Sequence, residues 1–140
     1  MEFKFLIKSK RVIELELENT YIFDESGNGI MLEEILKLTP KIKRFRIDIV
    51  QCNPHTSKII SELPFENKIE FFQLNNIPDA NLIAIDFAKF VAKNSAPNSK
   101  IIIHFQPNVD QIYKLIFAKT VKAHVNEIWL EGLQPNVTIS

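Results

Sequence analysis

The residue types best suited to bind a metal ion stand close together once in this sequence, at Cys52 and His55. A thiolate and an imidazole are both zinc ligands, but a structural zinc site takes four ligands, usually as two such pairs. The chain holds no other cysteine, and the remaining histidines, His104 and His124, belong to other segments. We therefore expect no metal and no cofactor, and we interpret residues 52–55 as a loop.

Nucleophilic catalysis would need Cys52 or a serine beside a histidine and an orienting acid. The pattern around His104 places that histidine on the outer face of a strand, where no serine or cysteine is expected beside it. A phosphate cradle would need glycines, because backbone N–H groups must approach the anion closely. The one candidate, residues 26–29 (Ser-Gly-Asn-Gly), lacks the Lys-Ser/Thr that follows such loops, and we interpret it as a turn. The sequence thus favours a protein that is not an enzyme.

Residues 41–46 (Lys-Ile-Lys-Arg-Phe-Arg) mix an aromatic ring with positive charge, a composition that nucleic-acid sites share. In a strand, however, Phe45 points to the opposite face from the two arginines, so its ring cannot stack on bases. The arginines are expected to pair with Glu14 and Glu16 on a neighbouring strand, about 5 Å away. Because Lys+Arg and Asp+Glu both number 17, we expect neither nucleic acid nor a membrane surface as partner.

Length and composition indicate one soluble globular domain over residues 1–140. The chain is 46% hydrophobic and 24% charged, close to the average of globular domains. No apolar run approaches the roughly 20 residues that a membrane span needs, and the N-terminus has no apolar signal segment. A single cysteine excludes an intrachain disulfide and fits a reducing compartment. We therefore expect a cytoplasmic protein.

The elements that position these side chains recur along the chain. The pattern apolar-x-x-apolar-x-apolar begins near residues 12, 42, 69, 100 and 125, in steps of 25 to 31 residues. The copy at residue 100 is degenerate, because Lys100 occupies its first apolar position. Apolar residues two apart within each copy predict a strand with one row inward and one row outward. Five strand-forming units of similar length indicate a repeat architecture.

Helical spacing follows every predicted strand except the last. Apolar stripes predict helices near 31–38 and 59–63, over 79–93 with Asp79 as N-cap, and over about 109–122. The last of these is expected to bury one shared face, made of Val109, Ile112, Tyr113, Ile116 and Phe117.

Two sheet architectures fit alternating strands and helices. A doubly wound sheet has helices on both faces and nearly continuous apolar strands. The outward row here is instead polar in the first two units, at Glu14, Glu16, Arg44 and Arg46. We therefore predict an α/β solenoid of about five parallel strands in sequential order, with its helices on one face. Residues 1–10 are expected to add an N-terminal cap, with a strand at residues 3–7.

The clear copies of the motif, with an apolar residue three positions beyond (Val50, Ile77, Leu133), resemble the leucine-rich repeat. The step length with a full helix is similar to the ribonuclease-inhibitor subtype, over about residues 11–135. The family's turn residue, Asn or Cys, is absent. The Phe- and Ile-rich texture is also similar to divergent repeats in nematode F-box-associated proteins of the FTH class. No F-box-like helical segment precedes the repeats here, so the resemblance implies a protein-binding solenoid, and a ubiquitin-ligase role is not carried over from it.

The outward row of a repeat solenoid forms one extended surface that commonly binds other proteins. Positions three and five of the last three motifs expose apolar side chains beside polar ones, which is the composition of a binding hot spot. The predicted partner-binding residues are Phe71, Gln73, Ile102, His104, Glu127 and Trp129. Trp129 is expected to point outward, in one apolar strip with Ile102 and Phe71.

Three other interpretations remain open from the sequence. A small α/β enzyme or nucleotide binder would need the doubly wound sheet, which would bury Glu14, Arg44 and Arg46 at high cost. The chain could instead be a structural segment of a longer repeat array or a ubiquitin-ligase substrate adaptor. The C-terminal strand would then leave an open edge, through which self-association is also conceivable.

Overall fold

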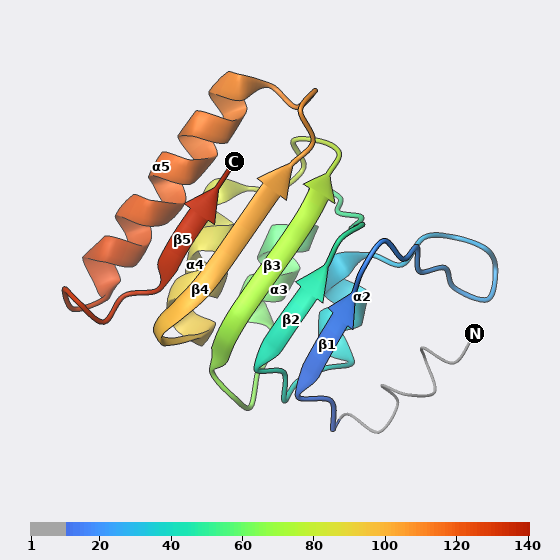
Figure 1. Cartoon of the computed structure of the whole chain (residues 1–140), viewed down its shortest axis with the longest axis horizontal. Helices are drawn as coiled ribbons and strands as arrows, with labels where there is room; N and C mark the ends of the chain where they lie inside the picture. The colour runs from blue at the N-terminus through green and yellow to red at the C-terminus, as the bar shows by residue number, and fades with distance from the viewer. Residues whose placement is uncertain (1–10) are drawn as a thin grey trace.

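The computed structural model describes residues 11–140, which form a five-stranded parallel sheet with strand order β1-β2-β3-β4-β5 (Figure 1). The predicted cap strand at residues 3–7 lies outside the described residues. The strands are β1 (Glu14–Leu17), β2 (Arg44–Ile47), β3 (Ile69–Ile77), β4 (Ser95–Phe105) and β5 (Asn136–Ile139). The helices are α2 (Leu32–Lys37), α3 (Thr56–Glu62), α4 (Ala84–Asn94) and α5 (Gln111–Ile128).

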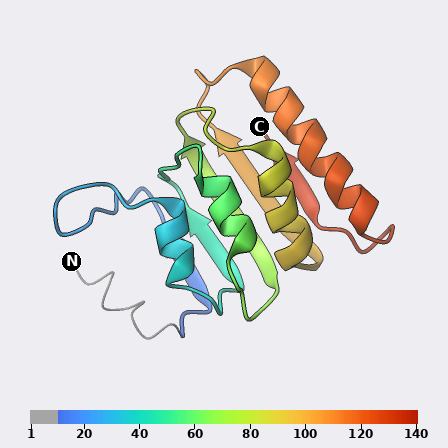
Figure 2. The same cartoon turned by 180° about the vertical axis from the view of Figure 1, so that it is seen from behind.

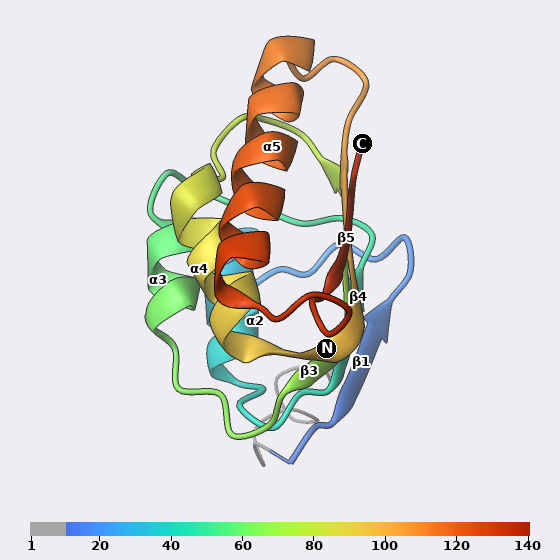
Figure 3. The same cartoon turned by 90° about the vertical axis from the view of Figure 1, so that its left-hand side faces the viewer.

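All four helices cover the same face of the sheet. They lie in front of it when the molecule is seen from behind (Figure 2), and the view along the sheet separates the helix layer from the strands (Figure 3). The predicted one-sided, sequentially ordered sheet is confirmed, and the doubly wound alternative is wrong. Glu14 and Arg44 are accordingly exposed, whereas a second helix layer would have buried their charges.

The core lies between the sheet and the helices. On the helix side, two rows of side chains cross the sheet, and each row joins residues that are opposite one another on adjacent strands. Phe45 and Phe72 are opposite each other on β2 and β3, and their rings stack at 5.2 Å. Phe90 of α4 meets the Phe72 ring edge-on, also at 5.2 Å. The inward rows are Leu15–Phe45–Phe72–Ile101–Val137 and Leu17–Ile47–Leu74–Ile103–Ile139.

Hydrogen bonds also join consecutive strand–helix units. In each case a side chain donates to a backbone carbonyl that lies 26 to 31 residues earlier, about one unit back. These bonds run from Asn67 to Lys41, Asn76 to Asp48, Asn81 to Cys52 and Tyr113 to Leu82. The loops between strands and helices are therefore tied to their neighbours, which satisfies carbonyls that the sheet and helices leave unpaired.

The fifth strand is not where the motif predicted it. Residues 125–128 form the last turn of α5, Trp129 is its C-cap, and β5 begins only at Asn136. Phe117, Val121 and Val125 recur every four residues on the buried side of α5, and this helical stripe overrides the six-residue strand pattern. A short apolar pattern fits a helix end as well as a strand, because periodicity alone does not separate the two over so few residues.

The fourth motif was also two residues out of register. Lys100, which was assigned to the first motif position, pairs with Phe71, and Ile102 pairs with Gln73. The strand is long and carries three consecutive isoleucines, so its alternation alone does not fix the alignment.

The helix predictions need two further corrections. Asp79 does not cap α4, because the helix begins at Ala84. The Asp79 carboxylate instead accepts a hydrogen bond from the backbone N–H of Asn81.

The buried face of α5 differs from the prediction as well. Phe117 and Val109 are buried and Tyr113 is half-buried, as expected. Ile112 and Ile116 are instead 66% and 59% exposed. Because α5 is the outermost helix, no neighbour within residues 11–140 covers its far side.

Candidate functional site

One side of the sheet carries no helix among the described residues (Figure 3). We call it the open face, and its side chains are those of the outward strand positions. They form two rungs across the strands, in the order Glu14–Arg44–Phe71–Lys100–Asn136 and Glu16–Arg46–Gln73–Ile102–Thr138. Acidic residues line β1, arginines line β2, and mixed apolar and polar residues line β3 to β5.

Four of the six predicted binding residues lie on the open face. Phe71, Gln73 and Ile102 are half-buried there, and His104 is exposed. Phe71 pairs with Lys100 rather than with Ile102, so the two apolar side chains are diagonal neighbours and not one continuous strip.

Glu127 and Trp129 do not belong to the open face. Both lie at the C-terminal end of α5, in the helix layer. The Trp129 ring is half-buried against the core, and its Nε1–H donates to the Ala92 carbonyl at 3.2 Å. The predicted outward tryptophan is therefore wrong, because the residue caps a helix instead of standing in a strand.

Charges on the open face are partly paired. Arg44 Nε lies 3.8 Å from Glu14 Oε1, as the sequence predicted, and the Arg44 guanidinium sits 5.0 Å from the centre of the Phe71 ring. Arg46 forms no ion pair with Glu16, its register partner on β1. It contacts Glu18 at 3.4 Å and Asp48 at 3.0 Å.

Asp48 is the centre of a polar network that sequence reasoning missed. Its side chain accepts hydrogen bonds from Arg46 Nε (3.0 Å), Asn75 Nδ2 (2.7 Å) and the Asn19 backbone N–H (3.2 Å). Burial alone would raise the pKa of Asp48, but the hydrogen bonds from Asn75 and Arg46 outweigh it and hold the pKa below its usual value. The network joins β1, β2 and β3 at the ends of the strands, and its chemistry is structural.

We expect Asp48→Asn to lower the free energy of unfolding at pH 7 by about 1–2 kcal/mol, because the buried side chain loses the charge that accepts hydrogen bonds from Arg46 and Asn75. A lowered pKa contributes stability above the ordinary aspartate value of about 3.9, and that contribution disappears as the pH falls through the folded-state pKa. Denaturant unfolding at pH 7 and at pH 3 should therefore show a gap between wild type and variant that closes in acid. The exposed Glu131→Gln serves as control, and a gap of equal size at both pH values would contradict the charged network.

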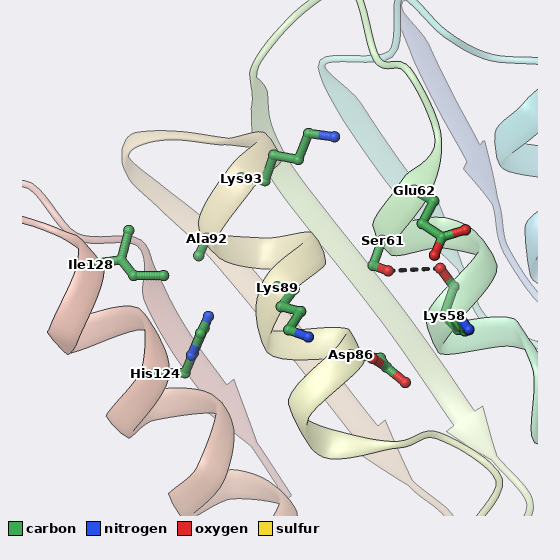
Figure 4. A pocket seen from close by; sticks show the side chains of 9 residues that line it. All are labelled: Lys58, Ser61, Glu62, Asp86, Lys89, Ala92, Lys93, His124 and Ile128. Carbon is green, nitrogen blue, oxygen red and sulfur yellow. Dashed lines mark hydrogen bonds between the residues drawn. The ribbon is translucent and has the colours of Figure 1, made fainter.

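The helix layer holds a second candidate, a groove of about 510 Å³ over α3, α4 and α5 (Figure 4). Its side chains spread along three helices instead of converging on one point, and positive and negative groups both line it. The Ser61 hydroxyl donates to the Lys58 carbonyl at 2.6 Å, so it does not face a base. The lining residues are Lys58, Ser61, Glu62, Asp86, Lys89, Ala92, Lys93, His124 and Ile128.

Other chemistry-bearing residues do not assemble into a centre. Cys52 is buried, and this burial raises the pKa of its thiol well above the usual range, which keeps it in the unreactive protonated form. Within residues 11–140, no group of three or more His, Cys, Asp or Glu side chains is placed to hold a metal ion. His104 places Nδ1 2.8 Å from the Phe105 carbonyl.

Comparison with protein-family models, with curated proteins and with solved structures finds no match to this chain. Among residues 11–140, none of the helices has the length and apolar character to cross a bilayer.

Proposed function

We propose that this chain is a non-enzymatic protein-interaction domain that binds its partner through the open face. The observation that carries the proposal is an uncovered sheet face with two apolar side chains, Phe71 and Ile102, near its centre. Proteins built from repeated strand–helix units commonly use such extended sheet surfaces as binding platforms. The mixed charges around the two side chains would supply the polar rim of an interface.

Phe71 is the strongest candidate for an anchor. The Arg44 guanidinium lies over its ring at 5.0 Å, and Lys100 is its register partner on the next strand. An aromatic ring that is already oriented loses little conformational freedom on binding. A partner's apolar side chain that covers it would gain roughly 25 cal/mol for each Å² of apolar area removed from water.

We also propose that the domain is a leucine-rich-repeat-like solenoid. Three features support this: the sequential parallel sheet, the helices on one face, and the side-chain bonds to carbonyls one unit away. The motifs that begin at residues 12, 42 and 69 are in register with one another, since Glu14, Arg44 and Phe71 share a rung.

The proposal is tested by affinity capture with the immobilised chain. Wild type and the control Lys89→Ala, on the solvent side of α4, should retain the same protein from an extract. The double variant Phe71→Ala/Ile102→Ala should retain at least tenfold less of that protein while keeping its helical circular dichroism, because it loses both anchors. Equal retention by all three chains would contradict the open face as the binding surface.

A further inference from the structure

Within residues 11–140, β5 pairs only with β4, and the backbone groups on its other edge are available for pairing. The Ser140 N–H donates to the Ile103 carbonyl, and the Ser140 carbonyl accepts from the Phe105 N–H. In a parallel pair alternate residues bond to the same neighbour, so Asn136 and Thr138 also face β4. The N–H and C=O groups of Val137 and Ile139 then point away from the sheet, and no hydrogen bond within residues 11–140 uses them.

A hollow lies beside this edge, because α5 extends past it. Figure 1 shows α5 further out than β5, beyond the last strand of the sheet. Lys122, Val125 and Asn126 of α5, with residues 134–137, line a hollow of about 190 Å³. Gln134 Oε1, in the lining, is buried without a hydrogen-bond partner. That volume suits one side chain of a bound molecule. The unpaired Gln134 oxygen would accept a hydrogen bond from a donor on the same molecule.

The apolar surface along this edge is incompletely covered. Val137 and Ile139 end the two inward rows and are half-buried, although their neighbours Ile101 and Ile103 are fully buried. On α5, Leu115 is 68% exposed and lies seven residues before Lys122, hence on the same side of the helix. An added strand would cover Val137 and Ile139 and would reach Leu115.

We propose that the β5 edge and the adjoining side of α5 bind an extended peptide segment of a partner protein as a sixth strand of the sheet. Backbone bonds to Val137 and Ile139 would hold the segment, as in other complexes formed by strand addition. Its alternate side chains, aliphatic in character, would point toward α5 and enter the hollow. Lys122 is the only charged side chain in that lining, so the segment is neutral or acidic there.

A second copy of this chain fits the edge poorly. Because α5 lies further out than β5 (Figure 1), a second copy that paired its β5 with this edge and continued the sheet with its helices on the same side would have to place its own α5 beside this one. A lone peptide carries no such helix. The opposite edge strand, β1, carries Glu14 and Glu16 on its open-face side, whereas residues 136–139 carry no charge that would discourage pairing.

The test uses phage-displayed random peptides of about twelve residues, selected on the immobilised full chain. The selected peptides should alternate aliphatic and other residues. Val137→Pro removes the outward N–H and should weaken their binding about tenfold or more, whereas the matched Val137→Ala keeps that N–H and should weaken it less than about threefold. Leu115→Asp, on an exposed helix position, should weaken the same peptides without unfolding the chain.

Thermal melts establish that each variant is folded, and if Val137→Pro unfolds, Leu115→Asp alone decides. Binding that is equal for wild type, Val137→Pro and Leu115→Asp would overturn the proposal. So would the absence of any enriched peptide, or a concentration-dependent dimer that Val137→Pro abolishes. These variants lie off the open face, so their outcome is separate from that of Phe71→Ala/Ile102→Ala.

Discussion

Phe72→Ala should lower the free energy of unfolding by about 3–5 kcal/mol, the usual cost of truncating a fully buried aromatic side chain. Phe72 is 0% exposed, and its ring contacts Phe45, Phe87 and Phe90 at centroid distances of 5.2 to 6.3 Å. The cavity would therefore open where β2, β3 and α4 meet. Because each unit is stabilised by its neighbours, we expect one cooperative unfolding transition at lower denaturant concentration, and not the loss of a single unit.

The adjacent residue provides the control for this prediction. Phe71→Ala removes an equally large side chain from the same strand, but on the open face, and should cost about 1 kcal/mol, mainly through the lost contact with Arg44. Denaturant unfolding monitored by circular dichroism measures both variants. Similar losses for Phe71→Ala and Phe72→Ala would mean that the two faces of β3 have been assigned wrongly.

Trp129→Ala should be the second most damaging of the proposed substitutions, with a loss of about 2–3 kcal/mol. The ring is half-buried against the core, and its Nε1–H bonds to the Ala92 carbonyl, so truncation removes packing and leaves an unpaired carbonyl. Trp129→Phe keeps most of the packing and loses the bond, and should cost about 1 kcal/mol.

Tryptophan fluorescence gives a second readout of the same site, because Trp129 is the only tryptophan. We expect a blue-shifted emission in the folded chain that moves to the red on unfolding. An emission maximum typical of water in the folded chain, together with a negligible loss for Trp129→Ala, would contradict the contact between α5 and α4.

Most of the fold could be predicted from period-two alternation and the polar outward row. The apolar residues Leu15, Leu17, Phe45 and Ile47 alternate with charged residues. In a sheet that helices cover on one side, the charged row must lie on the uncovered face. The order of the strands followed from the repeat architecture, in which each unit packs against the next. The fifth strand could not be found in this way, because a motif in the register of β5 would begin at the polar Gln134, whereas the full apolar pattern matches at Val125, in the last turn of α5.

Residues of the candidate site could be predicted only in those motifs whose strand register was predicted correctly. Phe71 and Gln73 come from a motif in correct register, and they lie on the open face. Trp129 was placed in a strand because three apolar residues matched the motif, although the buried stripe of α5 reaches Val125, four residues before it. The Trp129 ring is oriented by its bond to the Ala92 carbonyl, 37 residues away, which no local pattern reports.

The Asp48 network had a signal that could have been used. Asp48 and Asn75 stand at the same position of consecutive motifs, so the strand register places a carboxylate beside an amide. Arg46, two residues before Asp48 on the same face, completes the charge pairing. Aligning every outward position, instead of positions three and five alone, would have predicted this cluster.

The claim that the open face binds a protein is tested most directly by the dissociation constant of the captured partner for the Phe71→Ala chain. The proposal predicts a rise of about 30-fold or more, equivalent to a hot-spot loss of about 2 kcal/mol, in a variant whose unfolding curve shows a nearly intact fold. A dissociation constant equal to that of wild type, with the same nearly intact fold, would contradict it.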